Sequence, residues 1–188
     1  MTNRRELLGL APAAIVLTIA PAAPAFATVY QSDDAAQRSL FAQADAFEPV
    51  APTLNDAQRA DVAKAGGPQA AHGPMRAWIA RRQGVVIGHV FIDQVVGRQD
   101  FITYAVGIDA AGKLRPVQIL EYRESHGGEI RNARWLVQFD GRDSVGALRF
   151  GTDIKNIAGA TLSSEHVTAG VRRIFAIWQA AFAPPAGG

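Results

Sequence analysis

The chain has 188 residues, 48% of them hydrophobic, a formal net charge of +2 and no cysteine. These values are typical of one ordinary globular domain, and they exclude a disordered or fibrous chain. Lys and Arg exceed Asp and Glu by only 19 to 17, which argues against a nucleic-acid interface, and the lack of cysteine excludes disulfides, iron–sulfur clusters and thioether-linked haem.

The first 27 residues have the pattern of an export signal. An arginine pair precedes an apolar stretch over residues 7–20, and a small-residue cleavage site ends at Ala27. This pattern predicts a twin-arginine signal peptide that is cut after Ala27, and hence a periplasmic protein. The alternative is an uncleaved anchor that keeps the protein membrane-associated, although the stretch is shorter than a span of about 20 residues. Because the twin-arginine route carries folded proteins, it favours a protein that acquires a cofactor early.

Two helices are expected before the main domain. Ser32 and the acidic residues after it predict a helix over residues 33–43. Residues 49–75 are rich in Pro and Gly and are predicted to be mainly surface loop, with a short helix over residues 55–64. We assign residues 28–75 to this N-terminal part and residues 76–182 to the main domain.

The main domain begins with β-like runs separated by turns. Short links join the four predicted strands, so an antiparallel meander is favoured. After a polar segment, residues 131–139 are predicted to form a short helix that carries Trp135. The predicted fold class is therefore α+β, an antiparallel sheet packed with helices. The four strands are expected over residues 77–82, 85–96, 101–108 and 114–122.

The stretch AGATLSSEHVTAGVRRIFAIW, residues 158–178, leads into an amphipathic helix. Apolar residues recur three and four positions apart from Val167 to Trp178, which predicts a face buried in the core. Ser163 or Ser164 is expected to cap the helix. The small residues before Thr161 allow a second interpretation, in which the helix start accommodates an anionic group such as a phosphate.

The spacing of the ionisable residues does not support metal or acid–base chemistry. The four histidines show neither HxxxH nor HExxH spacing. Glu121 and Glu124 are interpreted as a solvated carboxylate and a loop carboxylate rather than as a catalytic pair. A redox role would therefore need an organic cofactor.

A resemblance to a known family is carried by four features in chain order. They are the strand block, the Glu-Ser-His-Gly-Gly loop from Glu124, Trp135 with Gln138-Phe139, and the segment from Gly159 to Ser164. Together they resemble the FMN-binding domain in the flavin subunits of Rnf-type and sodium-pumping NADH:quinone oxidoreductases, and most of all its small exported single-domain members. In that family a periplasmic flavin transferase joins FMN, through its phosphate, to the Thr of a Ser-Gly-Ala-Thr motif. The resemblance implies that Thr161 carries FMN as a phosphoester.

The resemblance also implies which other residues lie at the cofactor. Trp135 would pack near the flavin ring, with simple core packing as the alternative, and His126 is interpreted as a solvated loop residue. The remaining residues implied to contact FMN are Gly159, Ala160, Leu162, Ser163 and Ser164 beside Thr161, and Glu124, Ser125, Gly127 and Gly128 in the preceding loop.

Two positions depart from the family pattern. The family usually has an Asp six residues before the acceptor Thr and a Ser three residues before it, whereas this chain has Lys155 and Ala158. The missing Asp would weaken recognition by the transferase, and Lys155 would instead hold the FMN phosphate as a point charge.

The function expected from these features is electron transfer outside the cytoplasm by a carrier that receives electrons from a membrane redox protein. One alternative is a noncovalent FMN-binding or flavin-free partner or sensor module with a degenerate linkage motif. Another is a small periplasmic reductase whose flavin acts directly on a substrate.

Overall fold

The computed structural model describes residues 28–67, 74–124 and 127–184. The predicted signal peptide, and Ser125 and His126 of the predicted cofactor loop, lie outside these residues. Within the described part of the chain, no helix is long and apolar enough to cross a bilayer.

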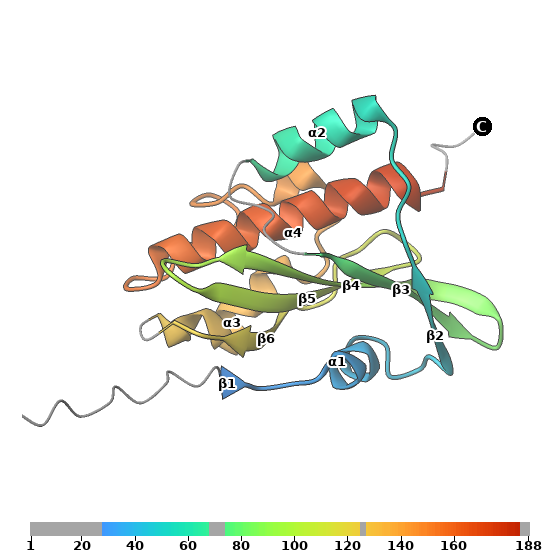
Figure 1. The fold of residues 1–188 in the computed structure, drawn as a ribbon, viewed down its shortest axis with the longest axis horizontal. Helices are drawn as coiled ribbons and strands as arrows, with labels where there is room; N and C mark the ends of the chain where they lie inside the picture. The colour runs from blue at the N-terminus through green and yellow to red at the C-terminus, as the bar shows by residue number, and fades with distance from the viewer. Residues whose placement is uncertain (1–27, 68–73, 125–126, 185–188) are drawn as a thin grey trace, which may run out of the picture.

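Six strands form one antiparallel sheet in the order β1-β6-β5-β4-β3-β2 (Figure 1). The predicted meander is confirmed, and it forms the four central strands. The sequence did not predict the two edge strands: β1 pairs with the end of β6, and β2 pairs with β3 where a loop was expected from residue 49. The strands are β1 (Thr28–Val29), β2 (Ala46–Val50), β3 (Arg76–Arg82), β4 (Val85–Val96), β5 (Phe101–Asp109) and β6 (Gln118–Tyr122).

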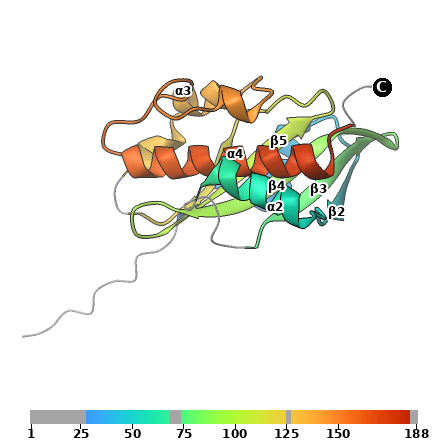
Figure 2. The same ribbon diagram turned by 90° about the horizontal axis from the view of Figure 1, so that it is seen from above.

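Helices cover both faces of this sheet. On one face lies α1 (Asp33–Leu40), and on the other lies α4 (Thr161–Ala181), against which α2 (Asp56–Gly66) packs (Figures 1 and 2). The residues between β6 and α4 form the 3₁₀ turns η1 (Gly128–Arg131), η2 (Val137–Phe139) and η3 (Val145–Ala147) and the short helix α3 (Ala133–Leu136). The architecture is the predicted α+β arrangement.

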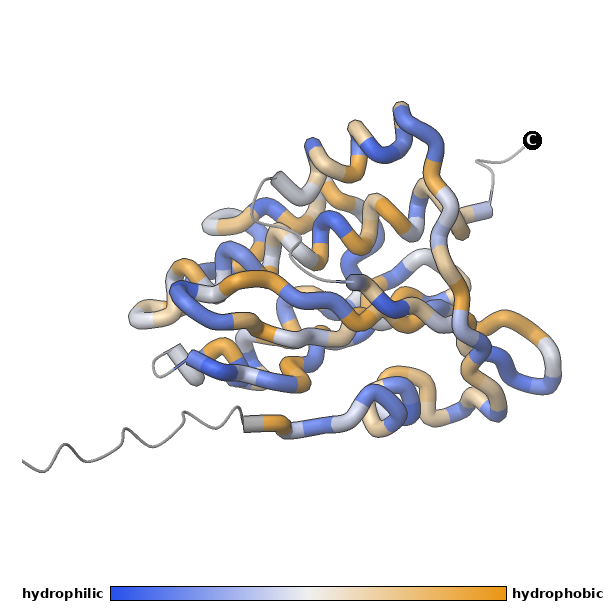
Figure 3. The backbone as a smooth tube through the Cα atoms, viewed as in Figure 1, coloured by the Kyte–Doolittle hydropathy of each residue, from blue (hydrophilic) through white to orange (hydrophobic). Residues whose placement is uncertain are grey.

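Two hydrophobic cores follow from this layering. Successive residues of β4 point to opposite faces, so Phe91 belongs to the core under α4, while Val90 and Ile92 belong to the core under α1. Because both faces are covered, β4 is hydrophobic at consecutive positions rather than at alternate ones. Along α4, by contrast, hydrophobic and hydrophilic residues are interspersed, as expected for a helix with one buried face (Figure 3).

The buried face of α4 was correctly predicted, and it runs from Val167 to Trp178. Gly170 lies on this face, where a Cβ atom would come within 2.1 Å of the Tyr104 hydroxyl oxygen. Only glycine lets helix and sheet approach so closely. The Tyr104 hydroxyl donates a hydrogen bond of 3.0 Å to Asp93, which is also paired with Arg173 of α4.

Three of the predicted elements differ from the structure by more than two residues. The strand expected over 114–122 pairs continuously only from Gln118, because Pro116 lacks the N–H that a ladder requires. The helix expected over 131–139 is broken into α3 and 3₁₀ turns, because the Asn132 side chain accepts the N–H of Arg134 and starts a new helix there. The helix expected over 33–43 ends at Leu40, because the buried Phe41 leaves helical geometry.

Candidate functional site

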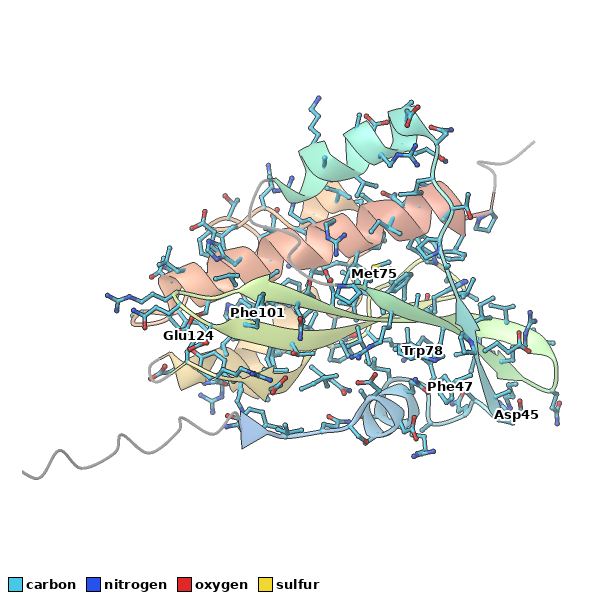
Figure 4. The ribbon with its side chains drawn as sticks, viewed as in Figure 1. Asp45, Phe47, Met75, Trp78, Phe101 and Glu124 are labelled. Atoms are coloured by element: carbon cyan, nitrogen blue, oxygen red, sulfur yellow. The ribbon has the colours of Figure 1, made fainter. Side chains whose placement is uncertain are left out.

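Three chain segments meet at one end of the sheet, where α4 begins. They are the turn between β4 and β5, the end of β6 with the loop after it, and the first turn of α4; Glu124 and Phe101 mark this end in Figure 4. A cavity of about 340 Å³ lies here. It is lined by Arg98, Gly159, Ala160, Thr161, Leu162 and Ser163. Five of these six residues were predicted to lie at a cofactor.

The start of α4 differs from the prediction that Ser163 or Ser164 caps the helix. The helix begins at Thr161, and among the described residues no side chain caps it. Ser164 is fully buried, and its hydroxyl donates to the Thr161 carbonyl oxygen at 2.9 Å. The earlier start follows from Gly159, whose φ of +87° turns the chain directly into the helix. The first-turn N–H groups are therefore left for another acceptor at the cavity.

Thr161 is exposed at the cavity, and its hydroxyl group is only weakly hydrogen-bonded within the protein. Its Oγ1 donates one long hydrogen bond, 3.4 Å, to the Ile157 carbonyl oxygen. A bond of this length is weak. The flanking Gly159 and Ala160 add little bulk, so the hydroxyl can be approached from the cavity side.

Tyr122 and Gly127 connect the sheet to this helix start. Burial raises the pKa of Tyr122, while a hydrogen bond with the Ser163 side chain acts in the opposite direction. A Cβ atom on Gly127 would lie 2.7 Å from the Tyr122 hydroxyl and 3.3 Å from the Ala160 Cβ. Gly127, in the loop predicted to touch the cofactor, thus lies against Ala160, the residue just before α4. Gly128 begins η1 with open space beside its Cα.

Glu124 binds the turn between β4 and β5. Its Oε1 accepts the backbone N–H groups of Arg98, of Gln99 at 2.6 Å and of Asp100 at 3.0 Å. This carboxylate oxygen is therefore already hydrogen-bonded within the protein. The geometry gives Glu124 a structural task that sequence reasoning missed, because nothing in the local sequence brings residues 98 and 124 together.

Arg98 is the cavity residue that sequence reasoning did not find. The sequence pattern predicts only that it lies in the turn between the strands expected over residues 85–96 and 101–108. Its side chain is exposed and lines the cavity, and among the described residues it makes no ion pair. A positive charge at this turn was visible in the sequence, but its position beside Thr161 depends on the tertiary fold.

Trp135 and Lys155 lie beside the site rather than in the cavity lining. Trp135 is 5% exposed and packs on Phe139 with ring centroids 5.2 Å apart, which is the core-packing alternative. Its Nε1 donates to the Lys155 carbonyl oxygen at 2.6 Å, and the Lys155 N–H donates to Gln138 Oε1 at 2.9 Å. The backbone at position 155 is thus held in place, while the Lys155 side chain is exposed.

The sequence model of the FMN-binding domain matches residues 97–176. This match contains every residue that lines the cavity. Residues 97–176 form a domain of the FMN-binding family. FMN is the cofactor that this domain indicates, and the protein binds a flavin. A search of curated proteins found no match to the chain.

The residues at the cavity of this FMN-binding domain suit the cofactor. A volume of about 340 Å³ lies within the range of small-molecule sites, roughly 300–1,000 Å³. The uncapped start of α4 and the Arg98 guanidinium suit the phosphate. Leu162 is 47% exposed and Phe101 is 39% exposed, so apolar surface is available at this end of the molecule for a flavin ring.

Proposed function

We propose that this FMN-binding domain is an exported flavoprotein that transfers electrons outside the cytoplasm, with FMN linked to Thr161 as a phosphoester. The observation that carries the proposal is the position of Thr161, which lies exposed at a cavity and at a helix start without a side-chain cap. An exposed hydroxyl between small residues can be reached by a second enzyme. The partial positive charge of the helix N-terminus favours a phosphate there.

The linkage needs a flavin transferase and an activated donor, for which a flavin dinucleotide has the required chemistry. The bond between Thr161 Oγ1 and the FMN phosphorus forms as the pyrophosphate bond of the donor breaks. The nucleoside monophosphate leaves with the electron pair of that bond. The hydroxyl proton passes to a base on the transferase, because none of the described residues that line the cavity is a carboxylate or a histidine.

The same lining favours a carrier over a substrate-specific enzyme. Bound FMN supplies reversible electron transfer, for which the protein contributes binding and electrostatics. Tyr122 and Glu124, the ionisable side chains next to the cavity, take part in hydrogen bonds within the fold. A substrate-activating acid would need a free proton donor at the cavity. A membrane redox protein as electron donor or acceptor fits both this role and the predicted periplasmic location.

A second candidate is a noncovalent FMN-binding or flavin-free module with a degenerate linkage motif. It is favoured by Lys155, which stands where the family usually has an Asp and whose side chain is exposed beside the acceptor segment. An exposed cation in place of a carboxylate would change the surface that a transferase meets. The intact Gly159-Ala160-Thr161 segment and its geometry favour the first candidate.

Intact mass and a visible spectrum of the protein purified from its own periplasm test the proposal. The expected result is a flavin spectrum with a mass increase equal to FMN less one water. A flavin spectrum with an unmodified mass would support the second candidate. An unmodified mass without any flavin would contradict electron transfer by this domain.

A further inference from the structure

We propose that Arg98 binds the FMN phosphate at the start of α4 and that Glu124 is the positioning residue that holds Arg98 there. This inference rests on the proposed function in one respect, namely that FMN lies in the cavity beside Thr161. In this proposal Arg98, rather than Lys155, is the cation that holds the phosphate.

The geometry of Arg98 carries the first half of the inference. Arg98 lies in the turn between β4 and β5, about 60 residues from Thr161 in the chain, yet both line one cavity. A guanidinium matches a phosphate with two parallel hydrogen bonds, so this residue type suits the phosphate better than the apolar flavin ring. The family match begins at Gly97 and so includes this turn.

Other cations of the neighbouring loops are engaged elsewhere or lie outside the lining. Arg123 pairs with Glu121 at 2.8 Å, and the Arg131 guanidinium lies 3.6 Å from the centroid of the Tyr30 ring. The Lys155 side chain is exposed and does not line the cavity. Arg98 is therefore the cation that the described part of the chain presents to the phosphate.

The hydrogen bonds of Glu124 support the second part of the inference, its role as a positioning residue. One carboxylate oxygen accepts the N–H groups of three consecutive residues, Arg98, Gln99 and Asp100. This contact joins the turn to the end of β6, which itself packs against the helix start through Tyr122 and Gly127. The backbone of Arg98 is thus held close to Thr161 before any ligand binds, so that less of the turn has to be ordered on binding.

Comparison of FMN with riboflavin tests the role of Arg98, because the two ligands differ only by the phosphate. The full chain, produced in a host without a flavin transferase, is titrated against each flavin and binding is followed by flavin fluorescence. We expect Arg98→Gln to weaken FMN binding about tenfold, the effect of one charge-assisted contact, and to leave riboflavin binding unchanged. Arg82→Gln is the matched control and should change neither, since Arg82 is an exposed arginine at the end of β3, paired with the first residue of β4 at the opposite end of that strand.

The possible results separate this inference from the proposed function. If wild type prefers FMN and Arg98→Gln binds FMN as tightly as wild type does, the role of Arg98 is wrong while the flavin site stands. If Arg98→Gln weakens both flavins equally, Arg98 contacts the ring and the phosphate assignment is wrong. If wild type binds neither flavin, the inference fails, because no residue of the flavin-free protein then holds the phosphate, whereas the proposed function is decided separately by the intact mass of the periplasmic protein.

A double-mutant cycle tests Glu124 as a positioning residue. We expect Glu124→Gln to weaken FMN binding severalfold in the wild-type background and to have no such effect in the Arg98→Gln background, because Glu124 acts through Arg98. Riboflavin binding should be unchanged in both. An equal loss of FMN affinity in both backgrounds, with folding confirmed by circular dichroism, would show that Glu124 does not act through Arg98.

Discussion

Asp93 of β4 and Arg173 of α4 form an ion pair between the sheet and the helix. The Asp93 side chain is fully buried and that of Arg173 is 15% exposed. The Tyr104 hydroxyl also donates to Asp93. Because charges so placed are poorly hydrated, removing one partner leaves the other uncompensated.

We expect Asp93→Asn to lower the free energy of unfolding by about 3 kcal/mol or more, the usual cost of breaking a buried pair. Urea unfolding measures this change. The control is Glu48→Gln in the Glu48–Arg81 pair, whose side chains are 53% and 28% exposed, and it should cost at most about 1 kcal/mol. If both variants lowered the free energy of unfolding by the same amount, burial of the Asp93 pair would not increase its contribution to stability.

Gly170→Ala should destabilise the protein, although replacing glycine by alanine inside a helix normally raises helix propensity. The new Cβ would lie 2.1 Å from the buried Tyr104 hydroxyl oxygen and 3.0 Å from Val95 Cγ1. Overpacking of this kind costs about 1–3 kcal/mol. Gly146→Ala, in the 3₁₀ turn η3, is the control without a close contact, since its nearest neighbour lies 4.0 Å away. A thermal melt in which Gly170→Ala unfolds at or above the wild-type temperature would show that the helix can shift without loss.

His89 should make the protein less stable in mild acid. Burial lowers the pKa of His89, and the nearby Arg81 lowers it further. Its Nδ1 accepts the Trp178 Nε1–H at 3.2 Å, so protonation there would also break this contact. The unfolded chain, with a histidine pKa near 6.5, therefore takes up the proton first as the pH falls. The contribution of neutral His89 to stability is therefore fully present above the pKa of the unfolded state, and it is lost as the pH falls through the lower pKa of the folded state.

The measurement is urea unfolding at pH 7.5 and at pH 5.5. His89→Gln, which keeps an acceptor for Trp178, should lose less stability between these pH values than wild type does. If the two proteins lose the same amount, His89 does not contribute to the acid sensitivity.

Thr161→Ala should abolish covalent flavin in protein purified from the periplasm of the native host, because the acceptor oxygen is gone. Thr161→Ser should largely keep it. Flavin fluorescence of an unstained denaturing gel distinguishes the two. Full labelling of the Ala variant would rule out Thr161 as the acceptor.

Lys155→Asp should raise the labelled fraction, because it restores the carboxylate that the family usually has at this position. Lys155→Ala, which removes the cation without adding a carboxylate, is the control that separates the two effects. The prediction is wrong if wild type is already fully modified or if the Asp variant carries no more flavin than wild type.

Local patterns in the sequence were sufficient to predict the four central strands, their antiparallel order and the buried face of α4. Periodicity reports which residues are buried, and short turns force neighbouring strands to pair. The same patterns missed β1 and β2, because a short edge strand is defined by its partner rather than by its own residues. They also placed the start of α4 at a serine, although the turn at Gly159 starts it two residues before Ser163.

Thr161 and its small neighbours were singled out as candidates from the sequence, because a hydroxyl beside glycine and alanine near a helix start indicates an anion site and the family resemblance implies the acceptor. Only the tertiary structure places Arg98 at the same cavity. It also brings the Glu124 carboxylate within hydrogen-bond distance of the turn that contains Arg98. These residues are far apart in the chain, and their proximity depends on the order and register of β4, β5 and β6. Local sequence determines what each segment offers to a ligand, whereas the pairing of distant strands decides which segments meet.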